Sequence, residues 1–212
     1  MAPNSLVLTV IGTSMLWVGW FGFNAGSALA ADGSAGMAMA VTHISAAMGG
    51  TTWMLIEWSN HGKPSVLGIA TGSIAGLAAI TPAAGFVGPV GGVIIGLASG
   101  AFCYWGANGL KRRFGYDDSL DVFGVHGIGG AVGTLLTAIF ASTAWGGFED
   151  NLRIGSLLGL QATGILVTSV YSAVMTFILV KIVDALIGIR VTPEEEGLGL
   201  DLSLHDERGF NL

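Results

Sequence analysis

The chain has 212 residues, of which 52% are hydrophobic and only 10% are charged, and its mean hydropathy is +0.72. This composition excludes a soluble globular domain, which needs far more surface charge. The net charge of −6 argues against nucleic acid as a partner, and the single cysteine, Cys103, excludes a disulfide framework and a cysteine-based metal site. We therefore predict an all-α integral membrane protein.

Six apolar segments follow one another along the chain, each near or above the roughly 20 residues that a membrane-spanning helix needs. They cover residues 5–30, 34–58, 65–82, 86–109, 121–145 and 154–180. A β-barrel would instead show alternating segments of about ten residues. We predict six transmembrane helices. The third, which ends at Pro82, is the shortest, and the apolar pattern of the sixth continues to Ile189.

The lysines and arginines gather in alternate loops between these segments. The loop set that holds Arg153 has no other basic residue, whereas the other set holds Lys63, Lys111, Arg112, Arg113, Lys181, Arg190 and Arg208. The positive-inside rule predicts a multi-pass protein of the cell inner (plasma) membrane with both termini in the cytoplasm. We divide the chain into a transmembrane domain, residues 1–190, and an acidic cytoplasmic tail, residues 191–212, with a net charge of −5.

Glycines recur at four-residue spacing, a pattern that lets transmembrane helices approach one another closely. These ridges are Gly68, Gly72 and Gly76; Gly92, Gly96 and Gly100; Gly129 and Gly133; and Gly155 and Gly159. We predict that each ridge marks a face packed against another helix.

The first helix carries a stripe of aromatic and polar side chains. Trp20, Phe23, Asn24 and Ser27 are spaced i, i+3, i+4 and i+7, so they share one face. Aromatic faces attract a small cation, and the Ser27 hydroxyl can accept a hydrogen bond from it. The stripe therefore indicates a polar passage inside a helix bundle. An aromatic belt at the outer membrane interface remains the alternative.

The fifth helix carries ionisable groups that a membrane does not readily accept. If this helix starts near Ser119, His126 lies roughly 10 Å into it. A pore or proton-relay role and a buried structural hydrogen bond both remain open for His126. We predict that Asp118 caps the helix start, and that Asp121 either bonds neighbouring backbone or takes part in function.

His43 lies beside Thr42 on the second helix, and its simplest interpretation is a histidine hydrogen-bonded between packed helices. Its role stays open. Metal-binding spacings of histidine and carboxylate are missing from the sequence, as are the motifs of hydrolases and kinases. We therefore expect no metal, no cofactor and no catalytic residues.

Four motifs, GWFGFNAGS (19–27), EWSNHGKPSVLG (57–68), ITPAAGFV (80–87) and DDSLDVFGVHGIGG (117–130), resemble the ammonium transporter (Amt/Mep/Rh) family. The GWFGFN form is similar to that of the bacterial and archaeal Amt branch. The resemblance covers essentially the whole chain, from the family's sixth helix to its tail. It implies six transmembrane helices that correspond to the carboxyl-terminal half of an eleven-helix protomer, which assembles into homotrimers.

The resemblance also implies roles for individual residues. Phe23 corresponds to one of two stacked gating phenylalanines, and Trp20 to the pore-lining tryptophan beside it. Ser27 corresponds to the serine of the outer cation site, and His126 to the second member of a histidine pair in the pore. Thr81 and Thr71 match pore or loop positions more loosely. Ammonium is expected to be recruited outside, deprotonated, and passed as ammonia through an apolar pore.

The resemblance further implies that the tail couples the pores and meets a PII signalling protein. The family's first five helices, with the other gating phenylalanine and the first pore histidine, have no counterpart in this chain. We expect either a fragment or a chain that a partner completes, and no conduction by this chain alone, because half a pore exposes its polar stripe to lipid. The alternative function is a non-transporting interaction or sensor module that presents the tail to a PII-type protein.

Overall fold

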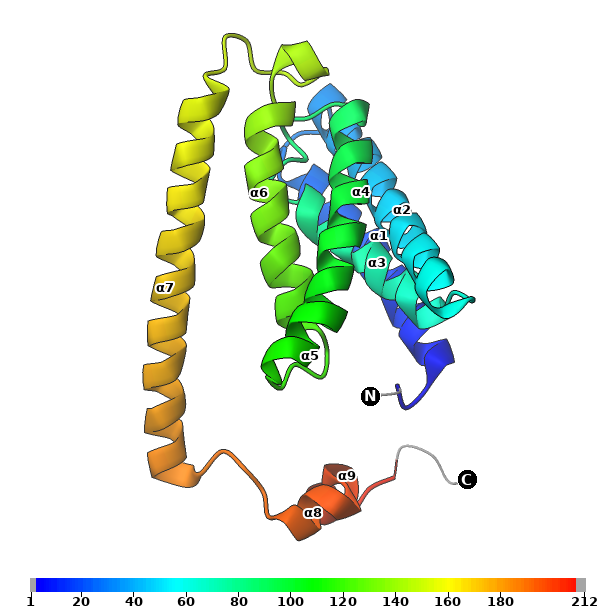
Figure 1. The fold of residues 1–212 in the computed structure, drawn as a ribbon, viewed down its shortest axis with the longest axis vertical. Coiled ribbons are helices and arrows are strands. Elements are labelled where there is room, and N and C mark those ends of the chain that lie inside the picture. The colour runs from blue at the N-terminus through cyan, green and yellow to red at the C-terminus, as the bar shows by residue number, and fades with distance from the viewer. Residues whose placement is uncertain (1–2, 209–212) are drawn as a thin grey trace. The chain divides into compact units, whose positions relative to one another are not determined.

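The computed structural model describes residues 3–208 and shows an all-helical chain in this range (Figure 1). Contacts divide it into two units that meet between Ile165 and Leu166, and each unit is described by itself. In chain order the elements are α1 (Leu6–Gly26), α2 (Gly33–His61), α3 (Val66–Ile80), α4 (Pro89–Tyr104), the π-helical turn η1 (Trp105–Leu110), α5 (Lys111–Phe114), the π-helical turn η2 (Phe123–Gly127), α6 (Ile128–Phe140), the 3-10 turn η3 (Thr143–Trp145), α7 (Ile154–Ile187), α8 (Pro193–Leu198) and α9 (Leu200–His205).

Each of the six predicted segments contains a helix, so the all-α prediction is confirmed. Four helical stretches are long and apolar enough to cross a membrane: Leu6–Gly26, Pro89–Phe114, Phe123–Phe140 and Ile154–Ile187. The chain is therefore a multi-pass membrane protein. Within the described residues, α2, with 29 residues, and α3, with 15, fall outside this group.

Polar side chains set several helix starts, as local sequence predicts. Ser5 caps α1 and Ser65 caps α3, each by accepting a hydrogen bond from a backbone N–H in the first turn. Asp32 caps α2 by accepting from the backbone N–H groups of Ser34 and Ala35. At its other end, α3 stops at Ile80, two residues before Pro82, whose ring nitrogen has no N–H to continue the helical hydrogen bonds.

Glycines bring α2, α3, α4 and α6 close together in the first unit. A Cβ atom on Gly76 of α3 or Gly96 of α4 would meet the carbonyl oxygen or backbone of Ser45 on α2. A Cβ on Gly133 of α6 would meet the backbone of Ala79 on α3. These contacts confirm three of the predicted ridges, and the four helices accordingly lie side by side (Figure 1).

The prediction for the fourth glycine ridge is wrong. Gly155 and Gly159 on α7 have no described neighbour within 4 Å of an added Cβ. The spacing shows that a close approach is allowed, but it does not supply a partner helix.

Two apolar clusters form the core of the first unit. One gathers Val41, Ile80, Val87, Ile95 and Phe140 with small residues around them. The other joins Trp53, Ala75, Cys103, Ala107 and Val125. The first cluster includes Ile80 at the end of α3, and the second includes Val125 of η2, so packed side chains fix both of these positions.

The second unit holds most of α7 and the acidic tail. At about 1.5 Å per residue, the 34 residues of α7 extend roughly 50 Å, more than the hydrocarbon core of a bilayer, as predicted from its apolar pattern. Gly188, with φ 75°, ends the helix in the left-handed conformation. In the tail, Thr192 and Glu195 form a reciprocal capping box at the start of α8.

Candidate functional site

Trp20 is the point where three parts of the fold meet. Its ring lies parallel to that of His126, with 6.3 Å between centroids and 5° between planes. Trp20 also contacts Phe23 edge to face, with 6.2 Å between the ring centroids. The indole Nε1 donates a hydrogen bond of 2.8 Å to Oγ1 of Thr81 at the end of α3. The structure thus brings together Trp20, Phe23, Thr81 and His126, all selected from the sequence.

Asn24 lies on the same stripe of α1 and is almost fully buried, with 7% of its surface exposed. Its Nδ2 donates to Oγ1 of Thr42 at 3.0 Å, and the Thr42 hydroxyl donates to the carbonyl of Ala38. Asn24 is paired inside the bundle and Trp20 bonds to Thr81, so this part of the stripe faces other helices, whereas Phe23, 63% exposed, and Ser27 remain exposed in the structure. The pairing of Asn24 and Trp20 favours the interior position over an outer aromatic belt for these two residues.

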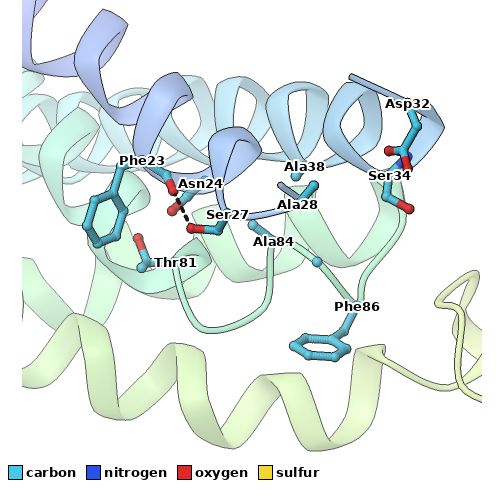
Figure 2. A pocket seen from close by; sticks show the side chains of 11 residues that line it. Phe23, Asn24, Ser27, Ala28, Asp32, Ser34, Ala38, Thr81, Ala84 and Phe86 are labelled. Carbon is cyan, nitrogen blue, oxygen red and sulfur yellow. Dashed lines mark hydrogen bonds between the residues drawn. The ribbon is translucent and has the colours of Figure 1, made fainter. Parts of the chain in front are cut away.

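A pocket of about 390 Å³ opens at the end of α1 (Figure 2). Phe23, Asn24 and Ser27 of α1 line it, together with Thr81 and Phe86 from the segment after α3. Ser27 is exposed, and its hydroxyl donates to the carbonyl of Phe23 at 2.7 Å, which leaves the oxygen free to accept.

Two polar residues of this pocket were missed by the sequence analysis. Asp32 and Ser34, at the start of α2, also line it. An aspartate directly before an apolar helix predicts only a cap, and the Asp32 Oδ1 atom does accept from the Ser34 and Ala35 amides at 2.9 and 3.1 Å. The pocket therefore combines an aromatic ring, hydroxyl oxygens and a carboxylate, a set that suits a small cation with hydrogen-bond donors.

His126 lies in η2, and its helix begins at Phe123, so the estimate of roughly 10 Å from a start near Ser119 is wrong. The position of His126 along the bundle is given instead by its contact with Trp20. Trp20 is the fifteenth residue of α1, roughly 21 Å along that helix from Leu6. The His126 side chain is exposed and makes no side-chain hydrogen bond within the described residues. The hydrogen-bonded, buried environment is thus not observed for His126 among the described residues.

The start of the fifth segment holds a small charged cluster. Asp118 caps it, as predicted, by accepting from the backbone N–H groups of Val122 and Phe123 at 2.8 and 2.9 Å. Asp121 forms an ion pair with Lys111, a residue that the sequence analysis treated only as part of a basic loop.

His43 differs from its predicted environment. The ring is exposed and lies against Trp17 and Phe21 of α1, with centroids 5.3 and 5.9 Å away. Within residues 3–208, no hydrogen bond to it is found, so the predicted hydrogen-bonded histidine is not observed. Over the same range, no group of three or more histidine, cysteine, aspartate or glutamate residues could hold a metal ion.

Comparisons with known proteins show which proteins the chain resembles as a whole. Residues 1–210 match the family described as the Ammonium Transporter Family. The chain is 48% identical over 212 residues to the "Ammonium transporter" of Bacillus subtilis, covering 99% of this chain and 52% of that protein. It is 48% identical over 211 residues to "Ammonium transporter Amt1" of Archaeoglobus fulgidus, covering 98% of this chain and 53% of that protein.

A solved structure named "Sensor Amt Protein" has a TM-score of 0.87 and 32% identity, and the match covers 95% of this chain and 49% of that one. The bacterial and archaeal matches agree with the branch predicted from the GWFGFN motif. The chain spans about half the length of the curated relatives it matches.

Proposed function

Because this chain belongs to the ammonium transporter family, we propose that it supplies the carboxyl-terminal half of an eleven-helix pore that takes up ammonium. The observation that carries the proposal is the contact of Trp20 with Phe23, Thr81 and His126. This contact joins the gate and the pore residues that the family resemblance assigns.

The outer pocket is the proposed recruitment site. Ammonium carries four N–H donors and one positive charge, so it needs acceptors and an electron-rich surface. The free oxygen of Ser27 supplies an acceptor, and the ring of Phe23 supplies the surface. Asp32 on the same pocket attracts the charge.

Beyond this pocket, ammonia and its proton are proposed to separate. A bare cation is strongly disfavoured in an apolar passage, whereas neutral ammonia costs far less to transfer. The imidazole of His126, in its neutral form, offers one donor and one acceptor nitrogen to a small polar solute. Its parallel stacking on Trp20 keeps both nitrogens at the ring edge, free to face the passage.

The proposed membrane arrangement uses all six predicted segments. Besides the four long apolar stretches, α2 and α3 supply the remaining two crossings, and both pack against other helices of the bundle. An even number of crossings, with the basic residues gathered on one side, supports the proposal that both termini are cytoplasmic. Residues 1–190 then form the transmembrane domain and residues 191–212 the tail, within a homotrimer of complete protomers.

A second candidate function is signalling through the tail. The similarity to a structure named "Sensor Amt Protein" favours it, as does the well-formed start of α8 at Thr192 and Glu195. In this proposal the helices anchor the tail, and the tail presents its acidic surface to a PII-type protein.

The test of transport uses a chimaera in which this chain replaces the matching stretch of the Bacillus subtilis relative. In cells without other ammonium transporters, the chimaera should restore selective ammonium uptake, and His126→Ala should abolish selective uptake while trimers still form. Unchanged selectivity in the His126→Ala variant would contradict the proposed pore. Deletion of residues 191–212 separates the candidates: lost signalling with unchanged uptake favours a signalling role of the tail, whereas a chimaera that signals without any uptake favours the sensor module.

A further inference from the structure

One carboxylate satisfies three neighbouring backbone donors at the start of η2. The oxygens of Asp118 accept from the N–H groups of Val122, Phe123 and Gly124 at 2.8, 2.9 and 3.4 Å. The first four N–H groups of a helix have no partner within the helix. Asp118 therefore satisfies three of the backbone N–H groups at the start of the turn that carries His126.

Lys111, on α5, makes two polar contacts with the same loop. Its Nζ atom donates to the backbone carbonyl of Asp118 at 3.1 Å and also pairs with the carboxylate of Asp121. Asp121 has φ 56°, a left-handed conformation that is unfavourable for a residue with a side chain. Both charged side chains are 28% exposed, so the pair is largely shielded from solvent. The lysine thus holds a strained backbone position immediately before η2.

The two π-helical turns of the chain pack against each other beside this ion pair. Lys111 directly follows η1, and a Cβ on Gly124 of η2 would lie 2.8 Å from the backbone nitrogen of Ala107 in η1. Gly106 also has Gly124 and Ile128 as its nearest neighbours. The two turns therefore cannot shift independently, because no space separates their backbones.

We propose that Asp118 and Lys111 are positioning residues that keep η2 in its π-helical form and thereby set the direction of the His126 ring. An α-helix turns about 100° per residue, so loss of the extra residue of a π turn would rotate His126 by about that angle relative to α6. Such a rotation would break the parallel stacking on Trp20. This inference rests on the proposed function, in which His126 faces the passage.

The test measures ammonium uptake per folded transporter in the chimaera described above. Asp118→Ala and Lys111→Gln should each lower the maximum rate roughly 10- to 100-fold, the loss expected when a functional group is misplaced by about 1 Å. The KM for ammonium should change little, because the outer pocket at Ser27 is built by other elements. Discrimination of ammonium against potassium should fall together with the rate.

Matched controls lie next to each residue in the sequence. Asp117→Asn removes a carboxylate whose one described hydrogen bond is from the Ser119 hydroxyl, and Arg112→Gln removes an exposed charge in α5. Both controls should keep the parental rate. Lys111→Arg retains a cation that can pair with Asp121 and should recover most of the rate lost in Lys111→Gln.

The outcomes separate this inference from the proposed function. If the parent chimaera transports no ammonium, the proposed function fails. If the parent transports, and Asp118→Ala lowers only the amount of folded protein while rate per transporter and selectivity stay parental, Asp118 is merely a structural cap and the inference is overturned. Failure of Lys111→Arg to recover the rate would likewise remove Lys111 from the positioning role.

Discussion

Two tryptophan–histidine pairs join α1 to other helices, and they differ in almost every respect. Trp20 and His126 lie parallel, at 5°, and the indole N–H of Trp20 is bonded to Thr81. Trp17 and His43 are closer, at 5.3 Å, but tilted by 40°. The indole N–H of Trp17 is buried and has no partner among the described residues.

The comparison shows that two tryptophan–histidine contacts on one helix can differ in how well the surrounding residues define them. Trp20 is bonded to Thr81 at the end of α3 and stacks on His126 of η2, so two segments besides α1 define the direction of its ring. The corresponding contact of Trp17 is the tilted one with the ring of His43 on α2. The parallel rings and the bonded indole N–H of Trp20 define this pair better than the tilted rings and unpaired indole N–H define the other, which supports the proposed passage at Trp20 and His126.

The largest expected effect comes from removing the two histidines separately in the chimaera. His126→Ala should lower selective ammonium uptake at least about 100-fold, the contribution of a well-placed proton-transfer or hydrogen-bonding group. His43→Ala should leave uptake within about threefold of the parent, because truncating a side chain away from such features has little effect. Equal losses in both variants would show that the two pairs are functionally equivalent.

Adding a methyl group to a glycine of α6, the helix that directly follows the turn of His126, should disrupt the packing of that helix against α3. Gly133→Ala places a Cβ against the backbone of Ala79 and should destabilise the bundle by about 1–3 kcal/mol through overpacking. Gly130→Ala is the control, since nothing lies within 4 Å of its added Cβ. Thermal unfolding of the purified chimaera in detergent measures both. A Gly133→Ala variant as stable as Gly130→Ala would refute the close α3–α6 contact.

A subtler change makes the first pair resemble the second. Thr81→Val removes the acceptor of the Trp20 indole N–H and should cost about 1 kcal/mol, because a partly buried donor is left unpaired. Thr51→Val is matched to it, since among the described residues the Thr51 hydroxyl donates to the carbonyl of Ala47 in its own helix. Uptake should fall in the Thr81 variant and stay parental in the Thr51 variant, as measured in the same cells used for His126→Ala.

The smallest effect is expected at Trp17. Trp17→Phe removes an indole N–H that already lacks a partner, so unfolding free energy should change by less than about 1 kcal/mol. Trp20→Phe, which removes a bonded N–H, should cost more. A large loss of stability in Trp17→Phe would mean that the Trp17 indole has a partner in the membrane, and the contrast between the pairs would weaken.

Much of the fold could be predicted because its signals are local. Apolar runs indicate the helices, Asp32 and Ser65 mark their starts, and Pro82 marks an end. The spacing of Trp20 and Asn24 likewise predicted a shared interior face, since helix periodicity alone determines it.

The remainder depends on contacts that sequence patterns do not encode. A π turn differs from an α turn by one residue, and nothing in the sequence around His126 signals it. The Lys111–Asp121 pair and the left-handed backbone of Asp121 follow from how η1 meets η2. The outer pocket needs the start of α2 beside the end of α1, so Asp32 could be assigned only a capping role in advance.

The capping box in the tail has a consequence for how the start of α8 responds to pH. Hydrogen bonds from the backbone and the hydroxyl of Thr192 lower the pKa of the Glu195 carboxyl below its ordinary value. A depressed pKa means that the carboxylate stabilises the start of α8 at neutral pH, and that this contribution is lost only as the pH falls through the lowered pKa. Because this pKa lies below the ordinary glutamate value, the Glu195 side of the capping box is charged around neutral pH, and only strongly acidic conditions would weaken the start of α8.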